Sequence, residues 1–363
     1  MAVFGIASWT GTGLGVEMDR MTMDPMKSDR MNPTTFRNRA GRRAGAYLLA
    51  LTIGGTVACA APAAGRPAAS AAPSTAAVAD QAPAPVADQA PAPMLTAELR
   101  KLESERAVRI GAFAYDTGTG RTVAYRPDES FPILSVFKAF AAAAILQKAR
   151  RTDPGLLERR VHWTEADEVP NSPVTEGHGA AGMSVAELCH ATVTRSDNTA
   201  GNLLLKELGG PAGLTRFFRS LGDPVSRLDR WEPALNDWRP GERRDTTTPV
   251  AVGRSFATLA VGTGGGRALV PADRAQLNAW LRATVTGDER IRAGLPADWT
   301  VGDKTGTSSS YGGAHDIAVA VPPSGAPVVL VVLTRRTTAA GPSDSGAVKA
   351  TATALVRELG LTR

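Results

Sequence analysis

The chain is predicted to adopt an α+β fold: an antiparallel five-stranded sheet flanked by N- and C-terminal helices, with an all-helical subdomain inserted. Three features of the 363-residue sequence predict it. Two strand-like segments around a glycine-rich turn begin near residue 109, and three more follow residue 298. The residues between them are mostly helical in pattern. Strands from both ends of one domain are expected to share one sheet.

The predicted sheet and its flanking helices come from residues 95–132 and 285–363. The stretch "TAELRKLESERA" places Leu99 and Leu102 on one helical face, and "RIGAFAYDTGTGRTVAYRPDES" has the pattern of a hairpin. The later segments "WTVGDKTGTS", "AHDIAVAVPP" and "APVVLVVLTRR" predict three further strands. A last helix is expected in "SGAVKATATALVREL".

The inserted helical part is predicted to span residues 133–284. It begins with a buried helix, "FPILSVFKAFAAAAILQKA", whose start holds Ser135. The segments "MSVAELCHATVTRSDNTAGNLLLKEL" and "PADRAQLNAWLRATV" also have helical patterns. A cleft between this part and the sheet is the expected ligand site.

Residues 1–60 are predicted to form an export signal region. Arg37, Arg39, Arg42 and Arg43 precede "AGAYLLALTIGGTVA", an apolar stretch that is short for a membrane span and ends in small residues. Met31 is an alternative start of the protein. Export through the Sec or the twin-arginine route, with cleavage after "ACA", predicts a secreted protein.

Residues 61–94 are predicted to be an Ala/Pro-rich linker. The octapeptide "VADQAPAP" occurs at 78–85 and again at 86–93, and the segment has almost no large apolar residue with which to build a core. An alternative to release is a lipid anchor at Cys59. In either case no membrane span is expected in the mature form.

The charge and the cysteine count exclude several classes of function. The net charge of +6 is diffuse, and no Lys/Arg run is interleaved with aromatic residues, so a nucleic-acid partner is not expected. Loss of Cys59 with the signal leaves Cys189 as one thiol, expected to be a buried apolar residue without a disulfide. The four histidines lack zinc-ligand spacing, so neither a metal nor a cofactor is expected.

The first candidate site is S-x-x-K, formed by Ser135 and Lys138. Their three-residue spacing puts both side chains on one helical face, where an amine can reach a hydroxyl and activate it as a nucleophile. The alternative is a capping serine followed by an exposed lysine. The apolar sequence on both sides of the pair argues against an exposed lysine.

Two further motifs have both a chemical and a structural interpretation. Ser196 and Asn198, in S-D-N, offer a hydroxyl that relays a proton and an amide that holds a carbonyl; the alternative is an ordinary Asx turn. Lys304, Thr305 and Gly306, in K-T-G, suit an edge strand that binds a carboxylate and lets a substrate approach closely. The alternative there is an exposed strand end.

The loop "RWEPALNDWRPGERRDTTTP" adds a carboxylate and an amide at fixed spacing, Glu232 and Asn236. Its Asp, Pro, Gly and Thr content predicts an irregular loop. A solvated loop charge is one interpretation of Glu232. Any other interpretation of the pair depends on the motifs elsewhere in the chain.

The order and spacing of S-x-x-K, S-D-N and K-T-G resemble those of the class A serine β-lactamases, which share a fold with the penicillin-binding proteins. The resemblance covers residues 96–363. It implies the β-lactamase/transpeptidase-like fold, no cofactor, a monomer, and hydrolysis of penicillins and some cephalosporins through a serine acyl-enzyme. Resistance to β-lactam antibiotics would follow.

The resemblance also implies roles for the residues that carry the chemistry. Ser135 would attack the lactam carbonyl, with the backbone N–H groups of Ser135 and Thr307 as the oxyanion hole. Ser196 would pass a proton to the lactam nitrogen with help from Lys304. Lys138 and Glu232 are alternative bases for acylation. Glu232 and Asn236 match the family's E-x-x-x-N loop and would hold the deacylating water, with Glu232 as its general base.

Other roles implied by the resemblance concern binding and the loop. Asn198 would hold the side-chain amide of the antibiotic and Thr305 its carboxylate. Arg290, in "ERIRAGLP", would be the arginine beside that carboxylate, because Gly313 stands at the family's other position for it. Arg230 and Asp245 would bridge the two ends of the loop as an ion pair.

Three departures from the family pattern concern substrate range. Asn171 stands where an aromatic residue often forms a wall of the site, which puts substrate stacking in doubt. Leu134 and Ser308 stand where carbapenem-hydrolysing members carry a cysteine pair, which argues against that subtype. Thr307, beside the expected oxyanion hole, is compatible with cephalosporin turnover.

Two competing functions share the first three motifs. One is a D,D-peptidase or transpeptidase that acts on cell-wall peptides, and the other is a receptor that stays acylated. The Glu232/Asn236 pair discriminates against the peptidase. The receptor would need a transmembrane segment beyond the signal, and the sequence has none.

Overall fold

The computed structural model describes residues 92–264 and 268–362. The predicted export signal, Cys59 and nearly all of the predicted linker lie outside these residues. Helix α1 begins at Pro93, two residues before the expected start of the folded region. In the described part of the chain, no helix is both long and apolar enough to cross a membrane.

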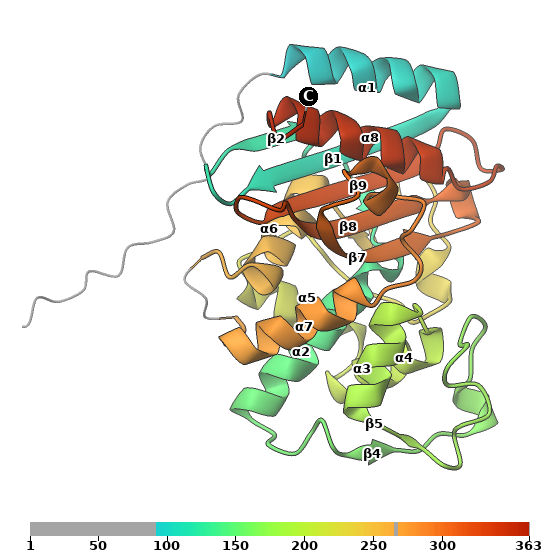
Figure 1. Ribbon diagram of the computed structural model, residues 1–363. Helices are drawn as coiled ribbons and strands as arrows, with labels where there is room; N and C mark the ends of the chain where they lie inside the picture. The colour runs from blue at the N-terminus through green and yellow to red at the C-terminus, as the bar shows by residue number, and fades with distance from the viewer. Residues whose placement is uncertain (1–91, 265–267, 363) are drawn as a thin grey trace, which may run out of the picture. The chain divides into compact units, whose positions relative to one another are not determined.

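A five-stranded antiparallel sheet forms the upper half of the molecule in Figure 1, with strand order β2-β1-β9-β8-β7. Strand β1 pairs along its whole length with β9, so the first and last strands of the folded region lie side by side. The predicted α+β class and the five-stranded sheet are confirmed. The strands are β1 Val108–Asp116, β2 Thr122–Tyr125, β7 Thr300–Thr307, β8 Ala314–Val321 and β9 Val328–Arg336.

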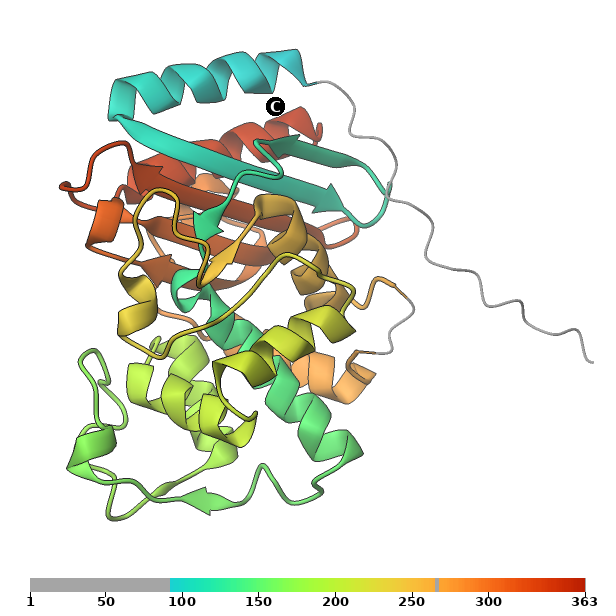
Figure 2. The ribbon, with the colours of Figure 1, turned by 180° about the vertical axis from the view of Figure 1, so that it is seen from behind.

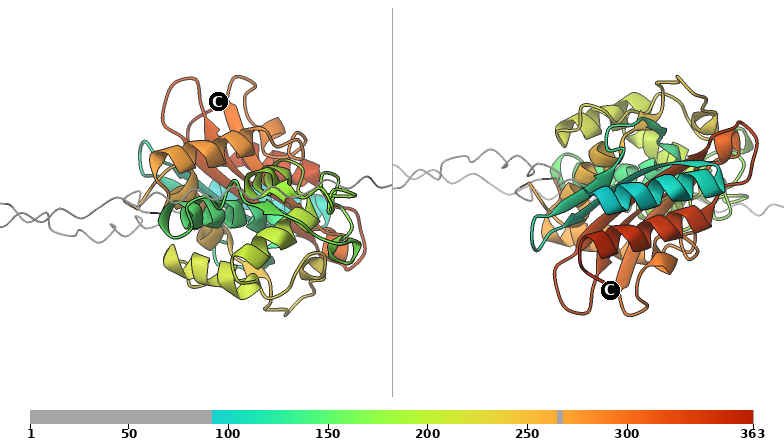
Figure 3. Two further views of the ribbon diagram at one scale, coloured as in Figure 1. Left: turned by 90° about the horizontal axis from the view of Figure 1, so that it is seen from below. Right: turned by 90° about the horizontal axis from the view of Figure 1, so that it is seen from above.

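Helices α1 (Pro93–Arg106) and α8 (Ser345–Glu358) lie next to each other across one face of the sheet, as the view from above in Figure 3 shows. Leu95 and Leu99 of α1 and Leu355 of α8 are buried in the core beneath them. This burial explains the apolar face predicted for the first helix: it packs on the sheet, and burial of apolar surface stabilises it there.

A second, larger core joins the other face of the sheet to the helical part. Helix α6 packs directly on this face, because a Cβ at Gly253 would come within 2.4 Å of the Phe113 ring. Helix α2 lies at the centre of this core, where Phe140 contacts the rings of Phe218 and Phe256 at 4.9 and 6.2 Å between centroids. The helices are α2 Phe137–Arg151, α3 Val185–Thr194, α4 Asn198–Glu207, α5 Pro211–Ser220, α6 Pro249–Ala260 and α7 Pro271–Arg282.

Short strands and 3₁₀ turns join the longer elements, and the view from behind in Figure 2 shows some of them where the two halves meet. Strands β3 (Phe131–Pro132) and β6 (Thr246–Thr247) pair where the chain enters the helical part and where the Glu232 loop ends. Strands β4 (Arg160–Val161) and β5 (Met183–Ser184) pair far from the sheet. The 3₁₀ turns are Leu134–Val136, Glu165–Asp167, Ala234–Asn236, Arg292–Gly294 and Ser310–Gly312.

Candidate active site

Ser135 lies in the 3₁₀ turn Leu134–Val136, immediately before α2, and not in the first turn of the α-helix itself. The preceding residue, Leu134, has a left-handed backbone with φ of 47°. Strand β7 runs close beside this turn. A Cβ at Gly306 would lie 2.9 Å from Leu134 Cβ and 3.3 Å from the Ser135 nitrogen, so only glycine allows this approach.

Lys138 is fully buried one turn after Ser135. Its Nζ lies 3.1 Å from Glu232 Oε1 and donates to Ser196 O at 2.7 Å and to Asn198 Oδ1 at 2.5 Å. Burial lowers the pKa of Lys138, while nearby Glu232 opposes this change. The exposed-lysine interpretation of S-x-x-K is therefore excluded.

Glu232 connects the nucleophile to the lysine. Ser135 Oγ donates to Glu232 Oε1 at 2.9 Å, the same oxygen that Lys138 approaches, and Asn236 Nδ2 donates to Glu232 Oε2 at 2.5 Å. Glu232 is only 3% exposed, so it is not a solvated loop charge. The Ser135 hydroxyl thus contacts Lys138 through the carboxylate, and not by the direct amine–hydroxyl bond that the spacing suggested.

The S-D-N segment joins the two lysines. Ser196 has φ of 57°, and its Oγ receives a hydrogen bond from Lys304 Nζ at 3.0 Å, with Lys138 Nζ at 3.5 Å. Asp197 caps helix α4 through Ala200 N and also accepts from Thr175. The structural interpretation, a cap, therefore applies to the middle residue, while its two neighbours contact the lysines.

Strand β7 is an edge strand of the sheet, as predicted from K-T-G. Lys304 is fully buried, and burial together with the nearby Lys138 cation holds the pKa of Lys304 well below its usual range. Thr305 Oγ1 lies 2.6 Å from Thr286 Oγ1. Thr307, at the end of the strand, is exposed, so this end of the site is open to solvent.

Arg290 reaches the same strand from the segment before it. Its guanidinium donates to Gly306 O at 2.9 Å, to His315 O at 2.7 Å and to Thr307 Oγ1 at 2.7 Å. Arg290 is 6% exposed, and burial lowers its pKa. Its partners are neutral oxygens, so its positive charge stays available at the open end of β7.

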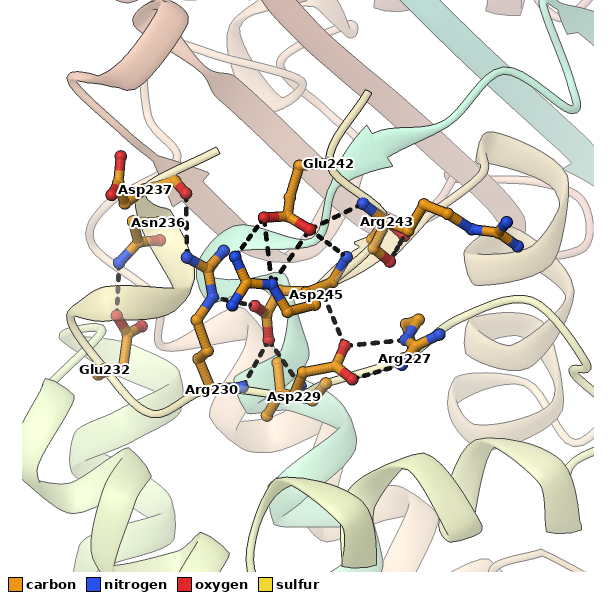
Figure 4. Close-up of polar contacts among 12 residues, drawn as sticks. Arg227, Asp229, Arg230, Glu232, Asn236, Asp237, Glu242, Arg243 and Asp245 are labelled. Carbon is orange, nitrogen blue, oxygen red and sulfur yellow. Dashed lines mark hydrogen bonds and ion pairs between the residues drawn. The ribbon is translucent and has the colours of Figure 1, made fainter. Parts of the chain in front are cut away.

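Arg230 and Asp245 bridge the ends of the Glu232 loop, as Figure 4 shows. Arg230 Nε donates to Asp245 Oδ2 at 2.6 Å, and Asp245 Oδ1 accepts from the backbone N–H groups of Asp229 and Arg230. Asp245 is fully buried, and its own N–H donates to Asp229 Oδ2 at 2.9 Å. These bonds close the loop at its base, while Glu232 contacts Ser135 and Asn236 contacts Glu232.

Comparison with known proteins identifies the family to which this arrangement belongs. A family model described as "Beta-lactamase enzyme family" matches residues 94–361. The solved structure of the ancestral (GNCA) class A β-lactamase is 49% identical, with a TM-score of 0.68, over 72% of this chain and 99% of that chain. The chain belongs to the class A β-lactamase family, whose members are hydrolases.

Two further relatives agree with this assignment. The β-lactamase FAR-1 of Nocardia farcinica is 50% identical over 264 residues, which cover 73% of this chain and 82% of that protein. The crystal structure of a β-lactamase from Streptosporangium roseum is 55% identical with a TM-score of 0.72, over 74% of this chain and 99% of that chain. The similarity to these two β-lactamases therefore extends over the whole described fold.

Two residues of this class A site were missed in the sequence. Asn202 exchanges two hydrogen bonds with the Glu232 backbone, donating to its O at 2.9 Å and accepting from its N at 3.0 Å. Its position four residues after Asn198, on the same face of α4, was the available signal. Thr286, beside Thr305, lies in a segment without a motif.

Other features of the class A chain concern its cysteine, histidine and acidic residues. Cys189 is fully buried, and burial raises the pKa of its thiol, as expected for an apolar residue without catalytic function. Burial lowers the pKa of His315 to about 4, and its ring bonds to Pro132 O and Thr334 N. Within the described residues, His, Cys, Asp and Glu form no group that could hold a metal ion.

Proposed function

We propose that the protein hydrolyses penicillins and some cephalosporins through an acyl-enzyme on Ser135, and thereby gives resistance to β-lactam antibiotics. The observation that carries the proposal is the convergence of Ser135 Oγ and Lys138 Nζ on one oxygen of Glu232, at 2.9 and 3.1 Å. A hydroxyl that donates to a buried carboxylate, itself paired with an amine, can pass its proton to these groups and is thereby activated as a nucleophile.

In acylation, Ser135 Oγ attacks the lactam carbonyl carbon and its proton passes to the Lys138–Glu232 pair. Burial lowers the pKa of Lys138 and so favours its neutral form, whereas Glu232 favours the charged form. The pair therefore offers an amine and a carboxylate as alternative bases. The negative charge on the lactam oxygen would be stabilised by the N–H groups of Ser135 and Thr307. The proximity of the Ser135 nitrogen to β7 at Gly306 supports this pairing.

When the lactam C–N bond breaks, the nitrogen needs a proton. Ser196 Oγ is the proposed donor, because it accepts from Lys304 Nζ at 3.0 Å and so has its own proton free to give. The nearby Lys138 and Lys304 can then replenish that proton. The product of this half-reaction is an ester on Ser135.

In deacylation, Glu232 is the proposed general base that removes a proton from water as the water attacks the ester carbonyl. Asn236 donates its amide to the second oxygen of Glu232, 2.5 Å away, and so fixes the carboxylate beside Ser135, where a water bonded to both side chains would be held close to the ester. The ester C–O bond then breaks, and Glu232 returns the proton to Ser135 Oγ.

The open end of β7 supports a substrate with a carboxylate. Arg290, Lys304 and the Thr305 hydroxyl offer two positive charges and a donor there, and a carboxylate binds well to such a set. Asn198 would hold the amide of the antibiotic side chain. The absence of the cysteine pair at Leu134 and Ser308 argues against carbapenems as good substrates.

Secretion of a monomer after removal of the export signal, with a lipid anchor at Cys59 as the alternative, is part of the proposal. A D,D-peptidase or an acylated receptor of the same fold remains the alternative function. The buried Glu232–Asn236 pair favours β-lactam hydrolysis over a receptor, which stays acylated, and over a transpeptidase, which passes its acyl group to an amine and not to water.

The deciding experiment mixes the purified protein with excess benzylpenicillin and follows ring opening by absorbance and protein mass at intervals. Many turnovers with a transient adduct on Ser135 are expected. Consumption of one equivalent with a persistent adduct would show that the water is not activated and that the protein is a penicillin-binding protein or a sensor.

A further inference from the structure

The connection between β7 and β8 contacts the segment Asn236–Trp238 of the Glu232 loop. Ser308 Oγ donates to Asn236 O at 2.9 Å, and Ser310 Oγ donates to Trp238 O at 2.5 Å. Ser308 Oγ also accepts from the Ser310 N–H at 3.0 Å, so the two serines form one unit. We name Ser308 and Ser310, with the two loop carbonyls that they hold, the serine clasp.

With the clasp, three consecutive backbone carbonyls of the loop each accept a hydrogen bond from a side chain. The carbonyl oxygen between the two, that of Asp237, accepts from Arg230 at 3.1 Å, as Figure 4 shows. Three consecutive carbonyls therefore point toward donors: Asn236 and Trp238 toward the β7–β8 connection, and Asp237 toward the base of the loop. Such a row fixes the backbone direction of the segment and, with it, the direction of the Asn236 side chain.

Packing holds one side of this segment and a cavity borders it. Trp238 is 4% exposed and contacts the Tyr311 ring edge-to-face at 5.7 Å, with Arg335 over its face at 5.2 Å. Behind it lies a cavity of about 640 Å³ lined by Trp238, Pro240, Gly241 and Arg335, among other residues. The segment lacks packed protein on the side of this cavity, so the hydrogen bonds of the serine clasp contribute to holding it in place.

We propose that the serine clasp, and Ser310 in particular, positions Asn236 for deacylation and couples the substrate-binding strand to the water-activating loop. This inference rests on the proposed hydrolysis. Ser310 contacts none of the reacting groups; it holds Trp238, two residues from Asn236, whose amide lies 2.5 Å from Glu232. The side chains proposed for acylation are Ser135, Lys138, Glu232 and Ser196, and neither clasp serine has a hydrogen bond to any of them.

The test separates the two half-reactions in Ser310→Ala by rapid mixing with benzylpenicillin. We expect the acylation rate constant to stay within twofold of that of the native protein. The deacylation rate constant should fall by roughly two- to tenfold, the factor that corresponds to one lost hydrogen bond. Ser310→Thr, which keeps the hydroxyl, should restore deacylation. Ser309→Ala is the matched control, because Ser309 is the exposed serine between the two clasp residues.

Each outcome is decisive. Unchanged deacylation in Ser310→Ala, or an equal loss in Ser309→Ala, would overturn the clasp. So would an equal loss of acylation and deacylation, because the hydroxyl would then support the fold as a whole. A native protein that never releases its adduct would instead overturn the proposed hydrolysis, and that result is read from the native protein alone.

Discussion

The two sides of the active site differ in whether their buried cations have a carboxylate partner. On the loop side, the buried Lys138 lies 3.1 Å from the buried Glu232, so positive and negative charges are paired. On the strand side, Lys304 and Arg290 are also buried, but among the described residues neither has a carboxylate within ion-pair distance. Asp303 and Asp316 act on both positive charges only at longer range. Their hydrogen-bond partners are hydroxyl and carbonyl oxygens.

This difference separates proton transfer from binding. A paired acid and base can exchange a proton at little cost, as both half-reactions require. Unpaired buried cations are costly, and a substrate carboxylate would relieve that cost when it binds. The site therefore predicts that changes on the loop side alter kcat and that changes on the strand side alter KM.

The largest effect is expected for Glu232→Gln, which breaks the loop-side pair. Deacylation loses its base, while Lys138 remains as a base for acylation. We expect a fall in kcat of roughly 10²–10⁴-fold and a persistent adduct on Ser135, read by protein mass after addition of benzylpenicillin. Rapid turnover by this variant would remove Glu232 from the role of general base.

Arg290→Ala tests the strand side. The loss of a charged hydrogen-bond donor should lower kcat/KM for benzylpenicillin by roughly 10–100-fold, mostly through KM. Arg290→Lys keeps the charge and should recover part of the loss. If kcat falls and KM does not change, Arg290 does not act on the ground-state carboxylate, and the proposed division between the two sides is wrong.

The sequence predicted the residues of both sides but not how they connect. Each motif alone is common, but the three in this order resemble one family, and that resemblance identified Ser135, Lys138 and Glu232. It could not show that Glu232 Oε1 lies between the other two, 2.9 and 3.1 Å away, because that distance depends on a loop about a hundred residues further along the chain.

Local pattern also predicted the sheet correctly, since strand signals at both ends of a domain leave few pairings. It placed Ser135 in a helix, whereas the structure places it in a 3₁₀ turn. The apolar run had no signal for this change, which accompanies the left-handed backbone at Leu134. The contacts of Ser308 and Ser310 with the Glu232 loop could not be predicted either, because their partners are backbone carbonyls, which carry no sequence signature.

Asp245→Asn tests the base of the loop. The amide keeps the oxygen that accepts from Asp229 N and Arg230 N but removes the charge opposite the partly buried Arg230. The free energy of unfolding should fall by about 3 kcal/mol, measured by urea denaturation. Glu105→Gln is the control, since both side chains of its ion pair with Lys101 are exposed and the substitution should change stability little. Equal stability of both variants would show that the buried pair does not hold the loop.

The smallest effect is expected for Lys304→Arg, read as a pH profile. Burial and Lys138 hold the pKa of Lys304 well below its usual range, so this lysine loses its charge as the pH rises. In the native protein, KM for benzylpenicillin should therefore increase on the alkaline side while kcat changes less. Arginine stays protonated, so the variant should have a several-fold higher KM at neutral pH, because of its different shape, but a flatter alkaline limb. An alkaline limb that is unchanged by the substitution would assign it to Lys138, the other buried amine, and would place the titrating charge on the loop side of the site.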